Sequence, residues 1–386
     1  EVVSENADVY RSEYLAYQLL RSLEPGNGGA DTKANGAVSG AKATPAEVLA
    51  RSDEERLAMV QEFASARYQE GYTKGVHDLD AARIFSALLN AHVALELARY
   101  RPAARACASV FWCRFCPEPV RALWTAKLKG FSERNKLFPG ERVQRNYIAA
   151  LQELVREFLR NTPLYPEELA DDAGEYLFHE LTGGEVFVVS REAHQLSVEF
   201  EKHLAAKDGR RVFERALQPL AEHPDSALEL TRDWVRGFLL GRLGTSQYLE
   251  EVTSILFCGD KVKRSVVQAG TTCVIEGMRG SHPRIDGNRY HFDYLDFHDR
   301  LRRFERDVVP RFERHRALKQ QLLDRERARL RLDEFKPRVL TSFVRNQLID
   351  RVYLPLIGDN LAKQIGAAGD QKRTDLMGLL LVVSPP

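Results

Sequence analysis

The sequence has few cysteines, almost no net charge and no long apolar run. The 386 residues contain five cysteines at irregular spacings. No stretch has the pattern of a signal peptide, and no apolar run approaches the length of a membrane span. These features argue against a disulfide framework and against a transmembrane helix. Charged residues make up 29% of the chain but cancel to a formal net charge of +1, so any nucleic-acid surface must be local. We therefore expect a protein of a reducing cytoplasm, without a membrane partner.

Hydrophobic residues make up 44% of the chain, which is normal for a globular protein with a core, and the length allows two or three domains. Apolar spacings of three and four predominate, so the predicted fold class is mainly α with a small antiparallel β insert, that is, α+β. The predicted parts are an N-terminal helix over 1–23, a flexible Gly/Ala-rich linker over 24–44, a helical domain over 45–245, a small α+β region with a hairpin over 246–294, and a long charged helix or helical hairpin over 295–337.

Local patterns support this division. The first helix has an aromatic and apolar face, formed by Tyr10, Tyr14, Tyr17 and Leu20. β-branched runs predict strands at 186–189, 262–267 and 271–275, and Gly270 separates the last two. Asp286-Gly287-Asn288 then supplies the chemistry of a hairpin turn. We expect the runs after residue 262 to form one small antiparallel sheet.

The densest polar cluster in the chain surrounds this turn, from His282 to Asp293. One interpretation is a metal-dependent enzyme that uses His282, Asp286 and His291 as ligands. The alternative is a hairpin whose His and Asp side chains bind turn amides. Turn chemistry accounts for the cluster with fewer assumptions, so no catalytic or metal residue is assigned there.

Cys113 and Cys116 form a single C-x-x-C motif, while Cys258 and Cys273 are distant in sequence and unpaired. A structural zinc site needs four ligands and usually a second such pair, and a thioredoxin-like motif follows a strand. We therefore interpret the pair as cysteines packed in an apolar helical region, not as a metal or redox site.

The segment from 296 to about 331 has the pattern of a long charged helix, with an apolar stripe that is enough for a helical hairpin or short coiled coil. Pro310 predicts a kink or a restart within it. Arg325, Arg327 and Arg329 stand at alternate positions, which spreads them around the helix and not along one phosphate-tracking stripe. A solvated face is the simpler interpretation. Nucleic-acid binding through 300–331 and these three arginines is the alternative.

The last thirty residues carry the most specific pattern. Ile357-Gly358 precedes a helix-forming segment, and an apolar run over 379–383 then stops at Ser384-Pro385-Pro386. Such a run is typical of a strand buried on both faces of a parallel sheet. The pattern resembles that of AAA+ nucleoside triphosphatases, in which such a strand leads directly into a phosphate-binding loop, with Ser384 at the position of the usual first glycine. Because the first residue is Glu1, we expect the chain to be part of a longer protein.

These residues, together with 71–80, 281–290 and 354–386, resemble the large bacterial AAA+ proteins identified as DNA repair ATPases. The resemblance covers most of the chain from about residue 45. It implies that 338–386 are the entry helices and first strand of a AAA+ ATPase domain. It also implies that Ile357 and Gly358 contact the adenine, and that Ser384, Pro385 and Pro386 lead into the phosphate loop.

The resemblance implies a regulatory or substrate-engaging region of a bacterial AAA+ ATPase that is linked to DNA repair. The cofactors implied for the parent protein are ATP and Mg²⁺. The partners are a downstream AAA+ motor domain, further copies of the chain, and DNA as a further candidate. The phosphate-binding lysine and the residues that position Mg²⁺ would lie downstream, so this chain alone is not expected to hydrolyse ATP or to bind these cofactors tightly.

Overall fold

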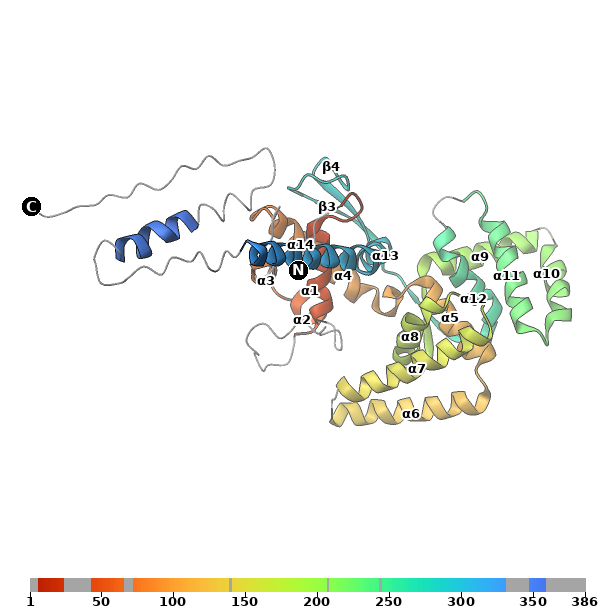
Figure 1. Ribbon diagram of the computed structural model, residues 1–386. Coiled ribbons are helices and arrows are strands. Elements are labelled where there is room, and N and C mark those ends of the chain that lie inside the picture. Colours follow the sequence, from red (N-terminus) through yellow and green to blue (C-terminus); the bar gives the residue numbers. More distant parts are fainter. Residues whose placement is uncertain are drawn as a thin grey trace, which may run out of the picture. The chain divides into compact units, whose positions relative to one another are not determined.

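The computed structural model describes residues 6–23, 43–65, 72–138, 141–206, 208–242, 245–330 and 347–358. Most of these residues are helical, and the strands form two small sheets, which confirms the predicted mainly α class (Figure 1). The chain divides into two compact units, Glu1–Val309 and Pro310–Pro386. None of the described helices is long and apolar enough to cross a membrane.

In the first unit, the α-helices are α1 (Arg11–Leu23), α2 (Pro45–Leu49), α3 (Asp53–Ser65), α4 (His77–Ala94), α5 (Pro102–Val110), α6 (Glu118–Leu137), α7 (Glu141–Asn161), α8 (Ala170–Thr182), α9 (Arg191–Ala206), α10 (Gly209–Leu217), α11 (Pro224–Leu239), α12 (Leu249–Cys258) and α13 (Tyr294–Arg303). The strands are β1 (Val186–Ser190), β2 (Lys263–Val267), β3 (Thr272–Glu276), β4 (Ile285–Asp286) and β5 (Arg289–Asp293). Short 3₁₀ and π-helical segments are η1 (Glu96–Arg99), η2 (Phe111–Phe115), η3 (Glu167–Leu169), η4 (Gln218–Leu220), η5 (Ser246–Tyr248), η6 (Gly259–Lys261) and η7 (Phe304–Val308).

The first helix, α1, lies in the core. The predicted face of Tyr10, Tyr14, Tyr17 and Leu20 is buried, and α1 packs against α4 (Figure 1). The helix also buries Glu13, which the apolar spacing did not indicate. Burying this carboxylate costs free energy unless hydrogen bonds or an opposite charge offset the cost. Tyr290 and Arg300, near the C-terminal end of the first unit's sequence, supply them.

The predicted strand at 186–189 is confirmed as β1. The run at 262–267, which was expected in the antiparallel sheet, lies elsewhere. β2 pairs with β1 in a parallel two-stranded sheet and does not join the antiparallel sheet. β1 is buried after its first residue, so its backbone needs partners on both edges. β2 covers one edge, and side chains of α8 bind the backbone of Val188: Glu180 accepts from its N–H at 2.6 Å and the Tyr176 hydroxyl contacts its carbonyl at 3.3 Å.

The predicted hairpin is confirmed. β5 lies between β3 and β4, and both neighbours are antiparallel to it. Gly287 and Asn288 form the two-residue turn between β4 and β5, with φ of 53° and 61°. Positive φ at both positions defines a type I′ turn, whose twist matches that of the flanking strands. Tyr290 and Phe292 point into the core, while His291 between them is exposed.

Helices α5, α7, α8 and α12 surround a second part of the core. Gly174 in α8 allows α7 to come close, because a Cβ at this position would lie 2.5 Å from the Cα of Gln152. Gln152 also donates from Nε2 to the carbonyl of Asp171 at 3.1 Å. This tight contact fixes the distance between the two helices.

Pro310 interrupts the helical pattern as predicted. The backbone is π-helical over η7, and α14 (Val309–Arg329) begins one residue before the proline. A proline removes one hydrogen-bond donor and clashes with the preceding turn, which a π-helical segment accommodates. α14 has no buried residue and belongs mainly to the second unit, in which residues 347–358 are also helical and contain η8 (Ile349–Tyr353).

Candidate functional site

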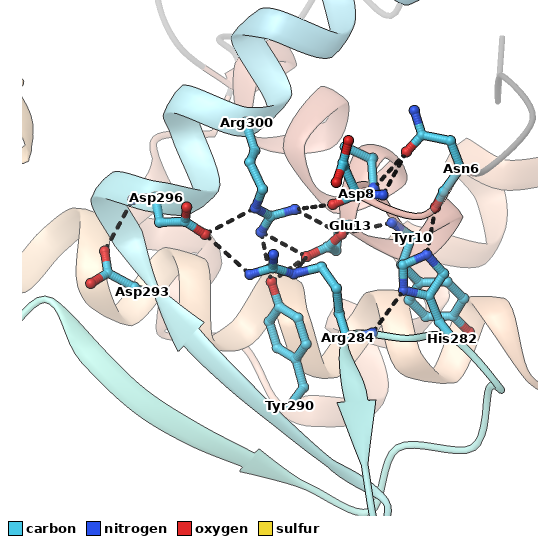
Figure 2. A network of polar contacts seen from close by, with 11 residues as sticks. Asn6, Asp8, Tyr10, Glu13, His282, Arg284, Tyr290, Asp293, Asp296 and Arg300 are labelled. Carbon is cyan, nitrogen blue, oxygen red and sulfur yellow. Dashed lines mark hydrogen bonds and ion pairs between the residues drawn. The ribbon is translucent and has the colours of Figure 1, made fainter.

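Two members of the polar cluster at His282–Asp293, His282 and Tyr290, lie in a buried network that ties the hairpin region to α1 and α13 (Figure 2). Glu13 lies at its centre and accepts hydrogen bonds from the Tyr10 amide at 2.7 Å, from Arg300 Nη2 at 3.0 Å and from the Tyr290 hydroxyl. Arg300 also donates to Asp296 Oδ2 at 2.9 Å. The buried carboxylate and guanidinium therefore compensate each other and hold three elements together.

The proposed metal ligands of this cluster are not brought together. His282 is buried, and both of its ring nitrogens are occupied by backbone groups: Nε2 lies 2.7 Å from the Asn6 carbonyl, and Nδ1 accepts from the Arg284 amide at 3.3 Å. Asp286 and His291 are exposed. Within the described ranges, no three His, Cys, Asp or Glu side chains form a group that could hold a metal ion. The cluster is explained by turn and backbone contacts, which was the simpler of the two interpretations.

The other predicted site residues lie in the second unit or beyond the described residues. Ile357 and Gly358 end the helical segment 347–358 and are exposed. Ser384, Pro385 and Pro386 lie outside the part of the chain that the structure describes. The three arginines of the nucleic-acid hypothesis are exposed on α14 and pair with acids of the same helix: Arg325 and Arg329 with Glu326 at 3.7 and 2.7 Å, and Arg327 with Asp324 at 3.5 Å.

A polar cavity in the first unit was not predicted. Its volume is about 790 Å³, and it is lined by residues of α1, α2, α4, η1, α7, α8, α13 and η7. Five arginines, four acids, three histidines and three tyrosines form most of its wall. They are Arg21, Arg99, Arg145, Arg302, Arg306, Asp171, Asp172, Glu175, Glu305, His92, His179, His298, Tyr17, Tyr100 and Tyr294. This volume is in the range of small-molecule sites in proteins.

Several charged side chains of the cavity wall form ion pairs with one another, and these pairs hold the surrounding helices in place. Asp172 accepts from Arg302 Nη1 at 2.5 Å and from Arg101 Nε at 2.7 Å, which joins α8 to α13. Arg21 of α1 forms an ion pair with Glu305 of η7. Charged hydrogen bonds of this kind hold the helices around the cavity in a defined position before any ligand arrives.

The guanidinium of Arg99, unlike those of Arg21 and Arg302, is held by a ring and a backbone carbonyl. It lies over the ring of Tyr100, 5.1 Å from the ring centroid, and its Nη1 donates to the carbonyl of Glu96 at 3.0 Å. Arginine presents five donors in a planar fork, so these two contacts leave donors for a further partner. Tyr100 is buried beneath it, and burial raises the pKa of its hydroxyl well above the ordinary value, with Glu175 adding to the effect. Tyr100 is therefore a neutral hydroxyl.

The three histidines of the wall are neutral. Burial lowers the pKa of His92 and that of His179 to about 4, and the positive charge of Arg99 contributes to both. Burial also lowers the pKa of His298 well below its ordinary value, with Arg302 as the next cause. His92 Nδ1 lies 3.1 Å from the Tyr294 hydroxyl, whereas His298 Nε2 is buried without a hydrogen-bond partner in the described structure. A buried unpartnered nitrogen in a cavity wall is costly unless a ligand or water binds it.

These pKa values predict acid sensitivity. A histidine with a pKa of 6.5 in the unfolded chain and about 4 in the folded protein takes up protons mainly in the unfolded state, so stability falls as pH drops from about 6.5 towards 4. For His92 the loss amounts to about 2 kcal/mol at pH 5. We expect His92→Gln to lose about 1–2 kcal/mol less than wild type between pH 7 and pH 5 in urea unfolding.

The matched control is His223→Gln, because this histidine is exposed. Its unfolding should keep the pH dependence of the wild type. Burial raises the pKa of Glu180 to about 6, so this residue makes the folded protein more stable as the pH falls, which is opposite to the effect of His92. The contribution of Glu180 is the same in the wild type and in both variants. Identical pH slopes for His92→Gln and wild type would contradict a neutral, buried His92.

Sequence reasoning missed the cavity because its wall comes from eight separate elements, none of which carries a recognisable motif. The available signal was histidine inside otherwise apolar helical segments, as at His92 and His179. Comparisons of the chain with protein-family models, with curated proteins and with solved structures find no significant match. The AAA+ resemblance therefore stays a prediction.

Proposed function

We propose that the first unit is a helical ligand-binding region whose cavity takes a small organic anion with a planar group. The observation that carries this proposal is the wall itself, which combines five arginines, against four acids, with three neutral histidines around about 790 Å³. Arginine is suited to phosphate and carboxylate because its planar fork binds two oxygens at once.

Arg99 and Tyr100 at the edge of the cavity explain how the anion would be held. The guanidinium is already stacked on the ring, so its orientation is restricted before binding and less side-chain entropy is lost. The neutral imidazole of His298 supplies a nitrogen that lacks a partner. Because the ring is uncharged, its N–H or lone pair can bind a polar group of the ligand without the cost of a second buried charge.

The resemblance to AAA+ proteins supports a role for this binding. In the large bacterial members the region before the ATPase domain is of unknown function, and we propose that here it engages substrate or regulates the motor in response to the bound anion. The parent protein would then use ATP and Mg²⁺ in the motor, while the first unit reports the presence of a metabolite. The link to DNA repair belongs to the same proposal.

The test is binding of defined anions to the whole chain. A panel of ATP, ADP, AMP, a hexose phosphate, citrate and inorganic phosphate should contain at least one compound that raises the unfolding temperature and binds in calorimetry. Arg99→Gln should weaken that binding at least about tenfold, because a charge-assisted hydrogen bond contributes about 1.5–3 kcal/mol. Arg191→Gln is the control, since Arg191 lies on α9 and pairs with Glu192.

Two results would overturn the proposal. One is the absence of binding by every member of the panel at millimolar concentration. The other is equal binding by wild type and Arg99→Gln, which would place the anion site outside the cavity.

Nucleic-acid binding by α14 is the second proposal. The helix contains seven Arg and Lys residues against three Asp and Glu residues, and none of its residues is buried. DNA affinity that falls steeply with salt and weakens on replacement of Arg325, Arg327 and Arg329 by alanine would support it.

A further inference from the structure

Two cysteines that are far apart in the sequence lie in contact in the core. Cys113 Sγ and Cys258 Sγ are 2.6 Å apart, although 145 positions separate them. Cys113 belongs to η2 and Cys258 is the last residue of α12. The separation is about 0.5 Å longer than an S–S bond of about 2.05 Å. The sequence spacing, in which Cys258 and Cys273 form no second C-x-x-C pair, did not indicate this contact.

The C-x-x-C motif contributes only one of its two cysteines to this contact. The thiol of Cys116, the second cysteine, lies 3.9 Å from the carbonyl of Pro117. Cys113 lies in the middle of a π-helical segment, in which one extra residue per turn displaces side chains from the regular helical positions. π-Helical segments are frequent at functional sites. Here the segment carries Cys113, whose sulfur contacts Cys258 of α12.

The surroundings of the pair favour a reactive thiolate at Cys113. Arg114 donates to the carbonyl of Phe257 at 2.8 Å and lies over the Phe257 ring, so its positive charge is fixed beside Cys258. The hydrogen bond with Cys258 lowers the pKa of Cys113, and Arg114, Lys261 and Arg264 lower it further, against the effect of burial. The same hydrogen bond and burial raise the pKa of Cys258. One thiolate beside one thiol is the arrangement from which disulfides form.

We propose that Cys113 and Cys258 are a dithiol site that hydrogen peroxide oxidises to a disulfide. The Cys113 thiolate attacks one peroxide oxygen, forming a sulfenic acid and releasing water once the leaving hydroxide is protonated. The sulfur of Cys258 then attacks the sulfur of Cys113, loses its proton, and displaces the second oxygen as water. Two thiols and one peroxide give one disulfide and two water molecules.

The bond would connect η2 to α12 inside the core. Both residues belong to the same hydrophobic cluster, so the native packing already holds them together and the bond mainly restricts the unfolded chain. In a reducing compartment such a bond is transient, so the disulfide forms while peroxide is present and is reduced afterwards. This site is independent of the anion cavity, because neither cysteine lines the cavity.

The experiment uses the whole chain with Cys273→Ser, which removes the exposed cysteine and with it intermolecular disulfides. After treatment with hydrogen peroxide, two thiols should be lost under denaturing conditions, the intact mass should fall by about 2 Da, and peptide mapping should join Cys113 to Cys258. The unfolding temperature should rise by roughly 4–8 °C and return to its starting value with dithiothreitol.

Adding Cys116→Ser should leave all of these results unchanged, whereas adding Cys258→Ser should abolish the disulfide and leave a sulfenic or sulfinic acid at Cys113. A disulfide between Cys113 and Cys116 would overturn the proposal. Retention of all thiols in the folded protein, under conditions that oxidise it in urea, would overturn it as well. Because the mapping is done without replacing either member of the pair, the result does not depend on whether the Cys258 variant folds.

Discussion

Replacing Glu13 by glutamine is expected to lower the free energy of unfolding by about 3–5 kcal/mol. Glu13 is fully buried, and its carboxylate accepts hydrogen bonds from Arg300 at 3.0 and 3.2 Å. Glutamine preserves the shape but removes the negative charge, which leaves the Arg300 guanidinium buried with much less compensation. Because Arg300 donates to both carboxylate oxygens of Glu13, the NH₂ group of glutamine faces an Arg300 donor in either orientation of the amide. Urea unfolding at neutral pH measures the loss.

The same hairpin offers a control. Arg289 and Glu276 form an ion pair at 3.5 Å, but both side chains are more than half exposed. Exposed pairs contribute between 0 and about 1 kcal/mol, so Arg289→Gln should unfold almost like the wild type. If the two variants lose similar amounts of stability, the buried network does not tie α1 to the hairpin and α13 as described.

The second large effect is expected at Gly174. Alanine there would place its Cβ 2.5 Å from the Cα and 2.6 Å from the amide nitrogen of Gln152, both backbone atoms that cannot rotate away. Helices α7 and α8 must then move apart, and we expect a loss of about 2–3 kcal/mol. α7 and α8 both line the cavity, so anion binding should weaken in parallel with stability.

Gly130 in α6 provides the opposite case. A Cβ there meets no atom within 4 Å, and the residue is exposed in the interior of a helix. Gly130→Ala should therefore raise the free energy of unfolding by about 0.5–1 kcal/mol, because alanine loses less backbone entropy on folding. Equal effects of Gly174→Ala and Gly130→Ala would show that α7 and α8 have room between them. Thermal unfolding of both variants is sufficient for this comparison.

Local features of the fold could be predicted from the sequence. The apolar face of α1, the strand β1, the turn at Gly287-Asn288 and the interruption at Pro310 each depend on a few neighbouring residues. Periodicity and turn chemistry act over such short distances, and they were sufficient here. The turn interpretation of His282 belongs to this group, because both of its ring nitrogens contact backbone groups.

Contacts between distant segments could not be predicted in this way. The pairing of β2 with β1 depends on which edge β1 leaves open, and two partners of Glu13, Tyr290 and Arg300, lie more than 270 positions away. The contact between Cys113 and Cys258 and the wall of the cavity have the same origin. No local spacing reports on such contacts, because they arise only once the helices have packed. The AAA+ motif at 379–386 stays a prediction, since it lies outside the described residues.

The hydrogen bonds between Glu13 and Arg300 also have a consequence for synthesis on the ribosome. The two residues are separated by 287 positions, so α1 leaves the exit tunnel long before α13 exists. At about 5–20 residues per second, this interval lasts roughly 15–60 s. Throughout it, Glu13 lacks Arg300, although α4, against which α1 packs, has already been translated. The ion pair that compensates the buried Glu13 charge therefore forms only when nearly the whole first unit has been translated.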